Sequence, residues 1–496
     1  MDPIHNGHSS SDNHFMKFIF ILIIVFTQIS FAQSFVKLKD WRYLPADEGF
    51  WTLIEKSIKE EDFKEGFKII EGQINKSKSQ FQRLETYLAL GSLCRKLNYS
   101  GCSFVSFMHI IKSSPSSMPA MQALLFLSED NSRFPQDEEE LSRIINTGSF
   151  KEIPEQLNPM VNYFIALDNL KKGKKQWAQK SAAEIPSHSY WGLRIQFFNA
   201  IYLIKEGKIN ESLNALNQLI IPVEKYPILA HSVKLQKARI LFELKQFSEA
   251  EEIYKNFNSA DRDFGRTILE RAWIQYYLKD FSLALGMLES LKTPFFKVSV
   301  SPEQYILSLL IYRDLCHYES ATDTSKVFNI RFKSIHEHLK SRKPLNEQVD
   351  LMRMVLLQPR LLSLANLVNE ITQEKQKIII EQSLGSTTGK LLNTLSVTYS
   401  NELRGRINRR IVTDLEKKAE HVLEVSEQMK ILDYIVNLDK FRLQQTFENR
   451  SYKTEFVERF AIDKLYWPIT DEAWWDELPK YRVLLEDRCK ISEIKK

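Results

Sequence analysis

The chain has 496 residues, 43% of them hydrophobic and 26% charged, so it is long and apolar enough to bury sizeable cores and does not resemble a disordered protein. Its 15 glycines and 16 prolines each make up about 3% of the residues, below the usual shares of roughly 7% and 5%, which indicates a helical protein and argues against sandwiches, barrels and doubly wound folds. The 68 basic and 63 acidic residues leave a formal charge of +5, too balanced for a nucleic-acid-binding surface.

Residues 1–32 have the features of a signal peptide. Met16 and Lys17 precede an apolar run over residues 18–29, and Ser30-Phe31-Ala32 is a small-x-small cleavage sequence. The polar residues before Met16 favour a translation start at Met16. The run of about a dozen apolar residues falls short of the roughly 20 that span a bilayer. We therefore expect export to the periplasm or envelope, cleavage near Ala32, and no transmembrane span in the mature chain.

The four cysteines are Cys94, Cys102, Cys316 and Cys489. In an oxidising compartment an even number permits pairing, and Cys94 with Cys102 is the natural local candidate because a helical hairpin could bring them together. The alternative is that the cysteines are buried as small apolar side chains. Their spacing resembles neither a zinc knuckle nor a thioredoxin-type pair.

Small residues recur through the first two thirds of the chain at a spacing close to 34 residues. Each is followed twelve positions later by a second small residue, as expected where the two helices of a hairpin press together. The pairs are Gly91 and Ser103, Ala166 and Ala178, Ala200 and Ser212, Ala238 and Ala250, and Ala272 and Ala284.

This pattern resembles the tetratricopeptide (TPR) family, which has a small residue, an apolar one three on, a small one twelve on and a large apolar one sixteen on. Ala238, Leu241, Ala250 and Tyr254 match it throughout, whereas the next repeat has Gln275 where the family has an aromatic residue. The resemblance implies an all-α fold with a TPR-like α-solenoid over residues 34–340. It also implies a scaffold for protein–protein interaction rather than a particular chemistry.

Solenoids of this family usually bind extended peptides in a concave groove. The resemblance places seven side chains on that surface: Arg194, Phe197, Arg239, Phe242, Arg266, Trp273 and Tyr276. Arginines and aromatic rings would suit a peptide that carries carboxylates. The alternative interpretation is that these aromatic residues belong to the core between repeats.

Residues 345–450 form a different region. No proline occurs between Pro359 and Pro468, and a glycine- and serine-rich cluster at residues 383–389 divides the region into two long helical segments. In the second segment an apolar stripe from Leu392 to Met429 predicts one face buried against another helix. A helix of about 60 residues would be roughly 90 Å long. We therefore expect a helical hairpin or coiled-coil arm whose partner is this chain, a second copy or another protein.

Residues 451–496 carry three tryptophans close together, Trp467, Trp474 and Trp475. We interpret this region as an aromatic clasp that docks onto the helices, with an exposed partner-binding motif as the alternative. This end of the chain and the Cys316–Ala321 region resemble uncharacterised envelope TPR proteins of gliding and predatory bacteria.

Catalytic motifs were sought and not found: the sequence has no phosphate-binding loop, zincin motif, nucleophile elbow or dinucleotide fingerprint. His336 and His338 would point about 200° apart on a helix and are unsuited to one metal ion. The sequence therefore predicts no enzyme, no cofactor and no metal site. We expect a scaffold that binds other proteins, not nucleic acid, in a motility, secretion or envelope-assembly machine. The disfavoured alternative is an exported cell-wall enzyme similar to lytic transglycosylases, whose Glu-Ser and G-L-M-Q motif is missing.

Overall fold

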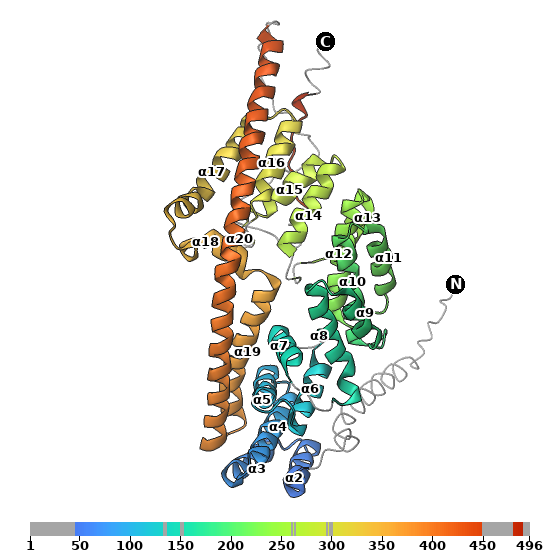
Figure 1. Ribbon diagram of the computed structural model, residues 1–496. Coiled ribbons are helices and arrows are strands. Elements are labelled where there is room, and N and C mark those ends of the chain that lie inside the picture. The colour runs from blue at the N-terminus through green and yellow to red at the C-terminus, as the bar shows by residue number, and fades with distance from the viewer. Residues whose placement is uncertain are drawn as a thin grey trace, which may run out of the picture. The chain divides into compact units, whose positions relative to one another are not determined.

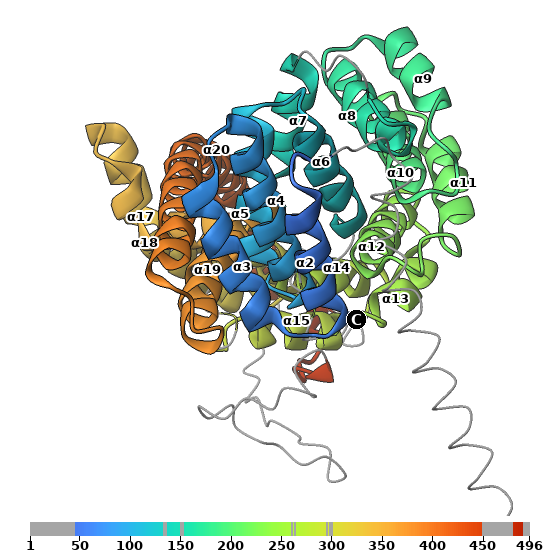
Figure 2. The ribbon, with the colours of Figure 1, turned by 90° about the horizontal axis from the view of Figure 1, so that it is seen from below.

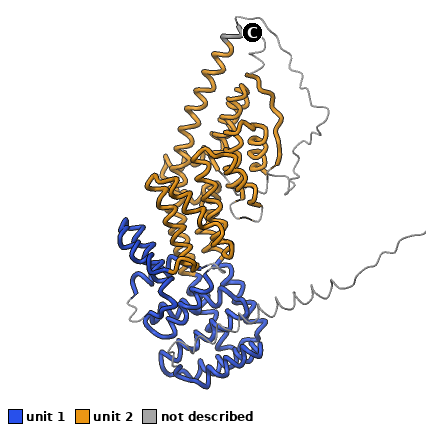
Figure 3. The backbone as a smooth tube through the Cα atoms, turned by 90° about the vertical axis from the view of Figure 1, so that its right-hand side faces the viewer, with its two compact units in different colours: residues 1–185, 367–400 blue, residues 186–366, 401–496 orange. Residues whose placement is uncertain are grey.

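The computed structural model describes residues 45–131, 136–148, 153–258, 261, 264–293, 296, 301–448 and 480–489. The predicted signal peptide and the three clustered tryptophans lie outside these residues. Within them the chain forms helices joined by turns and no strand, which confirms the predicted all-α fold. Figure 1 labels the helices, and Figure 3 colours the two compact units into which the chain divides.

Unit 1 takes its residues from 1–185 and 367–400. Neighbouring helices of this unit pack in sequence order, and Figure 2 shows α4 beside α5 and α6. The elements of its first segment are α2 (Glu48–Lys59), α3 (Phe63–Lys76), α4 (Gln80–Lys96), α5 (Ser100–Ser113), α6 (Met118–Asp130), α7 (Glu138–Thr147), the 3-10 helix η1 (Glu155–Leu157), α8 (Asn158–Lys171) and α9 (Lys175–Ala183).

Unit 2 takes its residues from 186–366 and 401–496. Its hairpins are the pairs α10 with α11, α12 with α13, α14 with α15, and α16 with α17. The elements of its first segment are α10 (Tyr190–Lys205), α11 (Ile209–Leu219), α12 (Pro227–Glu243), α13 (Phe247–Tyr254), α14 (Phe264–Tyr277), α15 (Phe281–Ser290), α16 (Glu303–Asp314), α17 (Tyr318–Ser341), the 3-10 helix η3 (Leu345–Glu347) and α18 (Val349–Leu356).

Seven helix–helix turns of the two units each contain one residue with left-handed backbone. These residues recur at nearly the repeat spacing and are Glu61, Asn98, Gly173, Gly207, Lys245, Lys279 and Cys316. Only two of the seven are glycines, although glycine adopts this conformation at the least cost. Five of the seven turns therefore form without the glycine that usually reveals such a turn in a sequence.

The paired small residues of the repeat pattern are all buried, one on each helix of a hairpin. The hydroxyl of Ser212 on α11 donates to the carbonyl oxygen of Ala200 on α10 at 2.7 Å. A side chain on Gly91 of α4 would overlap the ring of Phe107 on α5. Small side chains at these positions thus let the two helix backbones approach closely.

Two long helices follow the hairpins, α19 (Pro359–Glu381) and α20 (Ser386–Glu448), joined by a turn at residues 382–385. They lie in the region 345–450, for which we predicted a helical hairpin or coiled-coil arm. The second of them, α20, is one unbroken helix of 63 residues, and both compact units include part of it. Its length is compatible with compact units because residues 386–400 belong to unit 1 and the remainder to unit 2.

The apolar stripe of α20 is buried within this chain. Among the described residues, its packing partner is therefore the chain itself and not a second copy or another protein. Leu415, Val422 and Met429 share a core cluster with α16, α17 and α18 in unit 2. Leu392, Leu395 and Tyr399 are buried as part of unit 1. The repeat region predicted over residues 34–340 is divided between the two compact units, with the boundary at residue 185.

Unit 1 holds α19 through carboxylates that reach the start of α5. This start has no cap of its own, and Glu374 accepts a hydrogen bond from the backbone N–H of Cys102 at 2.9 Å. The Ser100 hydroxyl donates to Glu370 at 3.0 Å and to Glu374 at 3.2 Å. Burial raises the pKa of Glu374. The contact joins residues about 270 positions apart in the sequence. The carboxylates of α19 therefore supply the hydrogen-bond acceptors that the start of α5 lacks.

None of the helices within the described ranges is both long and apolar enough to cross a membrane alone. By length and composition, α18 and α19 meet the requirement together, with a bend of 82° between them.

Candidate functional site

Two of the three predicted groove arginines, Arg239 and Arg266, converge on one carboxylate. Glu270 on α14 receives the guanidinium of Arg239 at 2.9 Å and that of Arg266 at 3.0 Å. The hydroxyl of Tyr254 donates to the same carboxylate at 2.7 Å. Burial and the Glu270 charge raise the pKa of Tyr254, so the phenol remains a donor. Any acidic peptide at this surface would compete with Glu270 for both arginines.

The predicted groove aromatics contact the packed interior of unit 2. Trp273 is half-buried against two core clusters and meets the ring of Tyr276 edge-on, with centroids 6.0 Å apart. The Tyr276 hydroxyl donates to Asp314 at 2.8 Å. Phe242 packs against Phe247 and Tyr277. These contacts agree with the alternative interpretation, in which the aromatic residues contribute to packing between repeats.

The other two predicted groove residues lie on α10. Phe197 packs against the core cluster that α10, α11 and α12 share. The Arg194 guanidinium lies over the rings of Tyr190 and Trp191, 5.6 Å from each centroid. The structure thus brings Arg239, Arg266 and Glu270 together but does not bring Arg194 into the same group of contacts.

A second surface of unit 2 already holds an extended piece of chain. The tail segment, Lys480–Cys489, runs along α15 and the turn between α16 and α17 (Figure 1), and its residues 481–487 have no regular secondary structure. The backbone N–H of Val483 donates to the Ser282 carbonyl at 3.0 Å, and that of Arg488 donates to the Leu315 carbonyl at 3.1 Å. We call the residues that receive this segment the tail-binding surface.

Side chains of the tail segment alternate between contact and solvent at every residue from 480 to 489. Tyr481, Val483 and Leu485 pack against the core of α14, α15 and α16, whereas Leu484 is 56% exposed. This period of two is that of an extended chain with one face buried. A side chain on Gly286 would overlap the Tyr481 carbonyl, so the glycine permits the close approach.

Polar contacts fix the position of the tail segment along the surface. The Arg482 guanidinium donates to both carboxylate oxygens of Asp280, at 2.9 and 2.8 Å. The Nε2 atom of His317 lies 2.8 Å from the carbonyl oxygen of Glu486, and burial lowers the pKa of this imidazole. Neutral His317 in the Nε2–H form is therefore a donor to the tail segment.

Disulfides close both units. Cys94 and Cys102, the pair predicted from their closeness in the sequence, are bonded within the α4–α5 hairpin. Cys316 is bonded to Cys489, 173 residues away, and so ties the tail segment covalently to the turn before α17. All four cysteines are paired.

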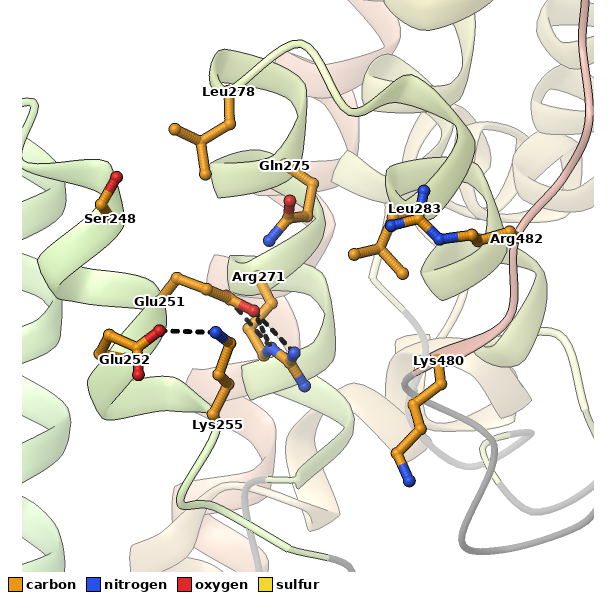
Figure 4. A pocket seen from close by; sticks show the side chains of 10 residues that line it. All are labelled: Ser248, Glu251, Glu252, Lys255, Arg271, Gln275, Leu278, Leu283, Lys480 and Arg482. Carbon is orange, nitrogen blue, oxygen red and sulfur yellow. Dashed lines mark hydrogen bonds and ion pairs between the residues drawn. The ribbon is translucent and has the colours of Figure 1, made fainter.

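A cavity of about 410 Å³ lies beside the tail segment, between α13, α14 and α15. Figure 4 shows its lining: Ser248, Glu251, Glu252, Lys255, Arg271, Gln275, Leu278, Leu283, Lys480 and Arg482. Arg271 donates to Glu251 at 2.7 Å, and both side chains are almost fully buried. We call this space the Gln275 cavity.

Sequence reasoning missed the residues of the tail-binding surface, and only part of the signal was visible. Once Cys94 and Cys102 pair, Cys316 and Cys489 remain for each other, yet no sequence feature required the first pair. Gln275 was recognised as a departure from the repeat pattern, but without a role. Among the described residues, no group of three or more histidine, cysteine or acidic side chains is arranged to hold a metal ion.

No known family model matches the chain, and a search of curated proteins finds no match either.

Proposed function

We propose that this chain is an exported scaffold that binds extended segments of other proteins on TPR-like helical hairpins. The observation that carries the proposal is the tail segment itself, because this segment, non-helical over residues 481–487, is held on α15 and the α16–α17 turn by alternating apolar contacts and backbone hydrogen bonds. A surface that recognises main chain and alternate side chains can accept other segments of the same pattern.

The cysteines support export. Disulfides persist in oxidising compartments and are rare in reducing ones. Both disulfides here join well-packed elements. Together with the apolar run at residues 18–29, they favour the periplasm or envelope. Mass spectrometry of the mature protein should find a start near Gln33, and a product that retains Lys17 would contradict this part of the proposal.

The binding part is tested with a chain that ends at Pro479, which leaves the tail-binding surface empty. A fluorescent peptide of residues 480–489, with its cysteine capped, should bind this chain saturably. Replacing Tyr481, Val483 and Leu485 of the peptide by serine should weaken binding at least tenfold, since each side chain loses apolar burial. Leu484→Ser is the matched control and should change little, because Leu484 faces solvent.

A partner assay follows from the same peptide. Proteins captured from fractionated envelopes by the chain ending at Pro479 should be displaced by the peptide and not by its triple-serine variant. If the shortened chain is folded by circular dichroism and binds no peptide, the tail-binding surface is not a recognition surface. We propose no catalytic activity for this chain.

A further inference from the structure

The Gln275 cavity has an amide at its wall. The Gln275 residue is 6% exposed, and its side-chain amide forms no hydrogen bond with any described residue. The amide atoms are not cut off from water, so solvent in the cavity reaches them. A ligand in the cavity can replace this solvent as the hydrogen-bonding partner of the amide.

The position of this amide in the repeat is apolar in the two preceding repeats. Three positions after the small residue, Leu203 follows Ala200 and Leu241 follows Ala238, whereas Gln275 follows Ala272. Glutamine is similar in size to leucine but polar, so it lines the space with a donor and an acceptor. A departure from the local pattern of this kind is often found where function opposes packing.

Charges around the Gln275 cavity favour an anion. Four cationic side chains and two carboxylates line it. Three of the cations are paired, Arg271 with Glu251, Lys255 with Glu252 and Arg482 with Asp280, and Lys480 remains as excess positive charge. Arg271 uses its Nε and Nη2 atoms for Glu251, which leaves the Nη1 donors without a partner among the described residues. Lys480 at the rim forms no ion pair with a described residue.

The remaining polar groups at the rim exchange easily. Lys255 pairs with Glu252 at 2.6 Å, but both side chains are more than half exposed, so this pair contributes little stability. An incoming anion can therefore recruit Lys255 at small cost. Leu278 and Leu283 supply an apolar wall next to these groups.

We propose that the Gln275 cavity is a binding site for a carboxylate attached to a short apolar group. The Gln275 amide and the Nη1 donors of Arg271 orient the carboxylate, Lys480 and Lys255 supply charge, and Leu278 and Leu283 receive the apolar part. The volume of about 410 Å³ is within the range of small-ligand sites. The C-terminal aliphatic residue of a peptide and a free small acid share this chemistry. The site goes beyond the proposed scaffold function and does not depend on it.

The test uses the full chain with both disulfides formed and three probes: N-acetyl-leucine, N-acetyl-glycyl-glycyl-leucine with a free carboxylate, and N-acetyl-leucine amide. Titration calorimetry should detect saturable binding of at least one acid, and the amide should bind at least tenfold more weakly. Tighter binding of the tripeptide would identify a peptide end as the source, and preference for N-acetyl-leucine would identify a free acid. Binding should also weaken as salt is raised.

Two variants and one control locate the site. Gln275→Phe removes the amide, places a larger apolar ring in the cavity and should weaken binding at least tenfold. Lys480→Ala changes only an exposed side chain and should weaken it several-fold. Lys326→Ala removes an exposed lysine of unit 2 that lies on α17, outside the cavity, and should leave binding unchanged.

Three results would overturn the proposal: no binding of either acid at millimolar concentration, equal binding of acid and amide, or unchanged binding by both variants. The tail-peptide assay uses none of these probes. If the acids do not bind, the proposed function is unaffected, and if the tail peptide does not bind, the proposed acid site is unaffected.

Discussion

In both units, helical hairpins bind a segment that follows them later in the sequence, but the bound segments differ in conformation and in how they are held. Unit 1 receives helices, α19 and the start of α20, and holds α19 through carboxylates at the start of α5. Unit 2 receives the tail segment in extended form and adds the Cys316–Cys489 disulfide. The helical hairpins of this chain therefore bind either a helix or an extended segment.

Both contacts contain a glycine whose missing side chain allows two backbone segments to pack closely. A side chain on Gly101 would lie 2.7 Å from the backbone nitrogen of Ile371, and one on Gly286 would overlap the Tyr481 carbonyl. They differ in covalent linkage, because the disulfide of unit 1 closes only a local hairpin. The tail segment is thus tied to its surface by a bond, whereas α19 is held by packing and hydrogen bonds alone.

Removing the disulfides should show the largest difference between the units. The entropy of loop closure grows with the length of the loop, so the bond across 173 residues should stabilise by about 5 kcal/mol and the bond across 8 residues by about 2.5 kcal/mol. Hydrogen exchange, read separately in each unit, measures this because two units need not unfold together. Equal losses for Cys316→Ser with Cys489→Ser and for Cys94→Ser with Cys102→Ser would show that loop length does not govern their effect.

Alanine at the two glycines tests the close approach next. Gly101→Ala and Gly286→Ala each push a methyl group into backbone atoms, which cannot rotate away, and should destabilise by about 1 to 3 kcal/mol. Gly72→Ala on α3 is the control, because nothing lies within 4 Å of the added carbon. There alanine should stabilise by up to about 1 kcal/mol. Thermal unfolding that is unchanged for Gly101→Ala and Gly286→Ala would mean that these contacts are looser than the structure shows.

Polar contacts should matter more in unit 1 than in unit 2. Glu374→Ala leaves the Cys102 N–H at the start of α5 without its acceptor and should cost about 1 to 2 kcal/mol. Arg482→Ala removes an ion pair whose side chains are 52% and 31% exposed, and should cost less than about 1 kcal/mol. A larger effect for Arg482→Ala, measured by protease protection of the tail segment, would reverse the order of the two units.

The smallest difference should appear with pH. The pKa of His317 is lowered from 6.5, so its contribution is complete above pH 6.5 and is lost as pH falls below that value. The pKa of Glu374 is raised by burial, so its protonation on acidification does not weaken unit 1. Between pH 7 and 5 the protection of the tail segment should therefore decrease, whereas that of α19 should not. His317→Gln keeps a donor and should remove the pH dependence.

Much of the fold could be predicted from the sequence. The scarcity of glycine and proline indicated helices, and the small residues at Ala200 and Ser212, or Ala238 and Ala250, are buried one on each helix of a hairpin. The apolar stripe of α20 correctly indicated a buried face. These features could be predicted because helical periodicity and close helix contact depend on nearby residues.

The candidate site could be predicted only in part. Arg239 and Arg266 were expected on one surface and do meet, but at Glu270, a residue that the repeat pattern does not mark. The Gln275 anomaly was visible as a mismatch, whereas the cavity around it also needs Lys480 and Arg482, more than 200 positions later. Such a site depends on which segment, distant in the sequence, packs onto the surface. A local repeat pattern does not identify that segment.

By itself, the sequence determined the helical class, the repeat spacing and the buried face of the longest helix, because each follows from local backbone preference and apolar periodicity. The tertiary structure alone decided that α20 serves two units, that Cys316 meets Cys489, and that the tail segment lies on α15. The physical reason is that these contacts join residues up to several hundred positions apart. Their formation depends on complementary shape and charge between surfaces that exist only after the hairpins have folded.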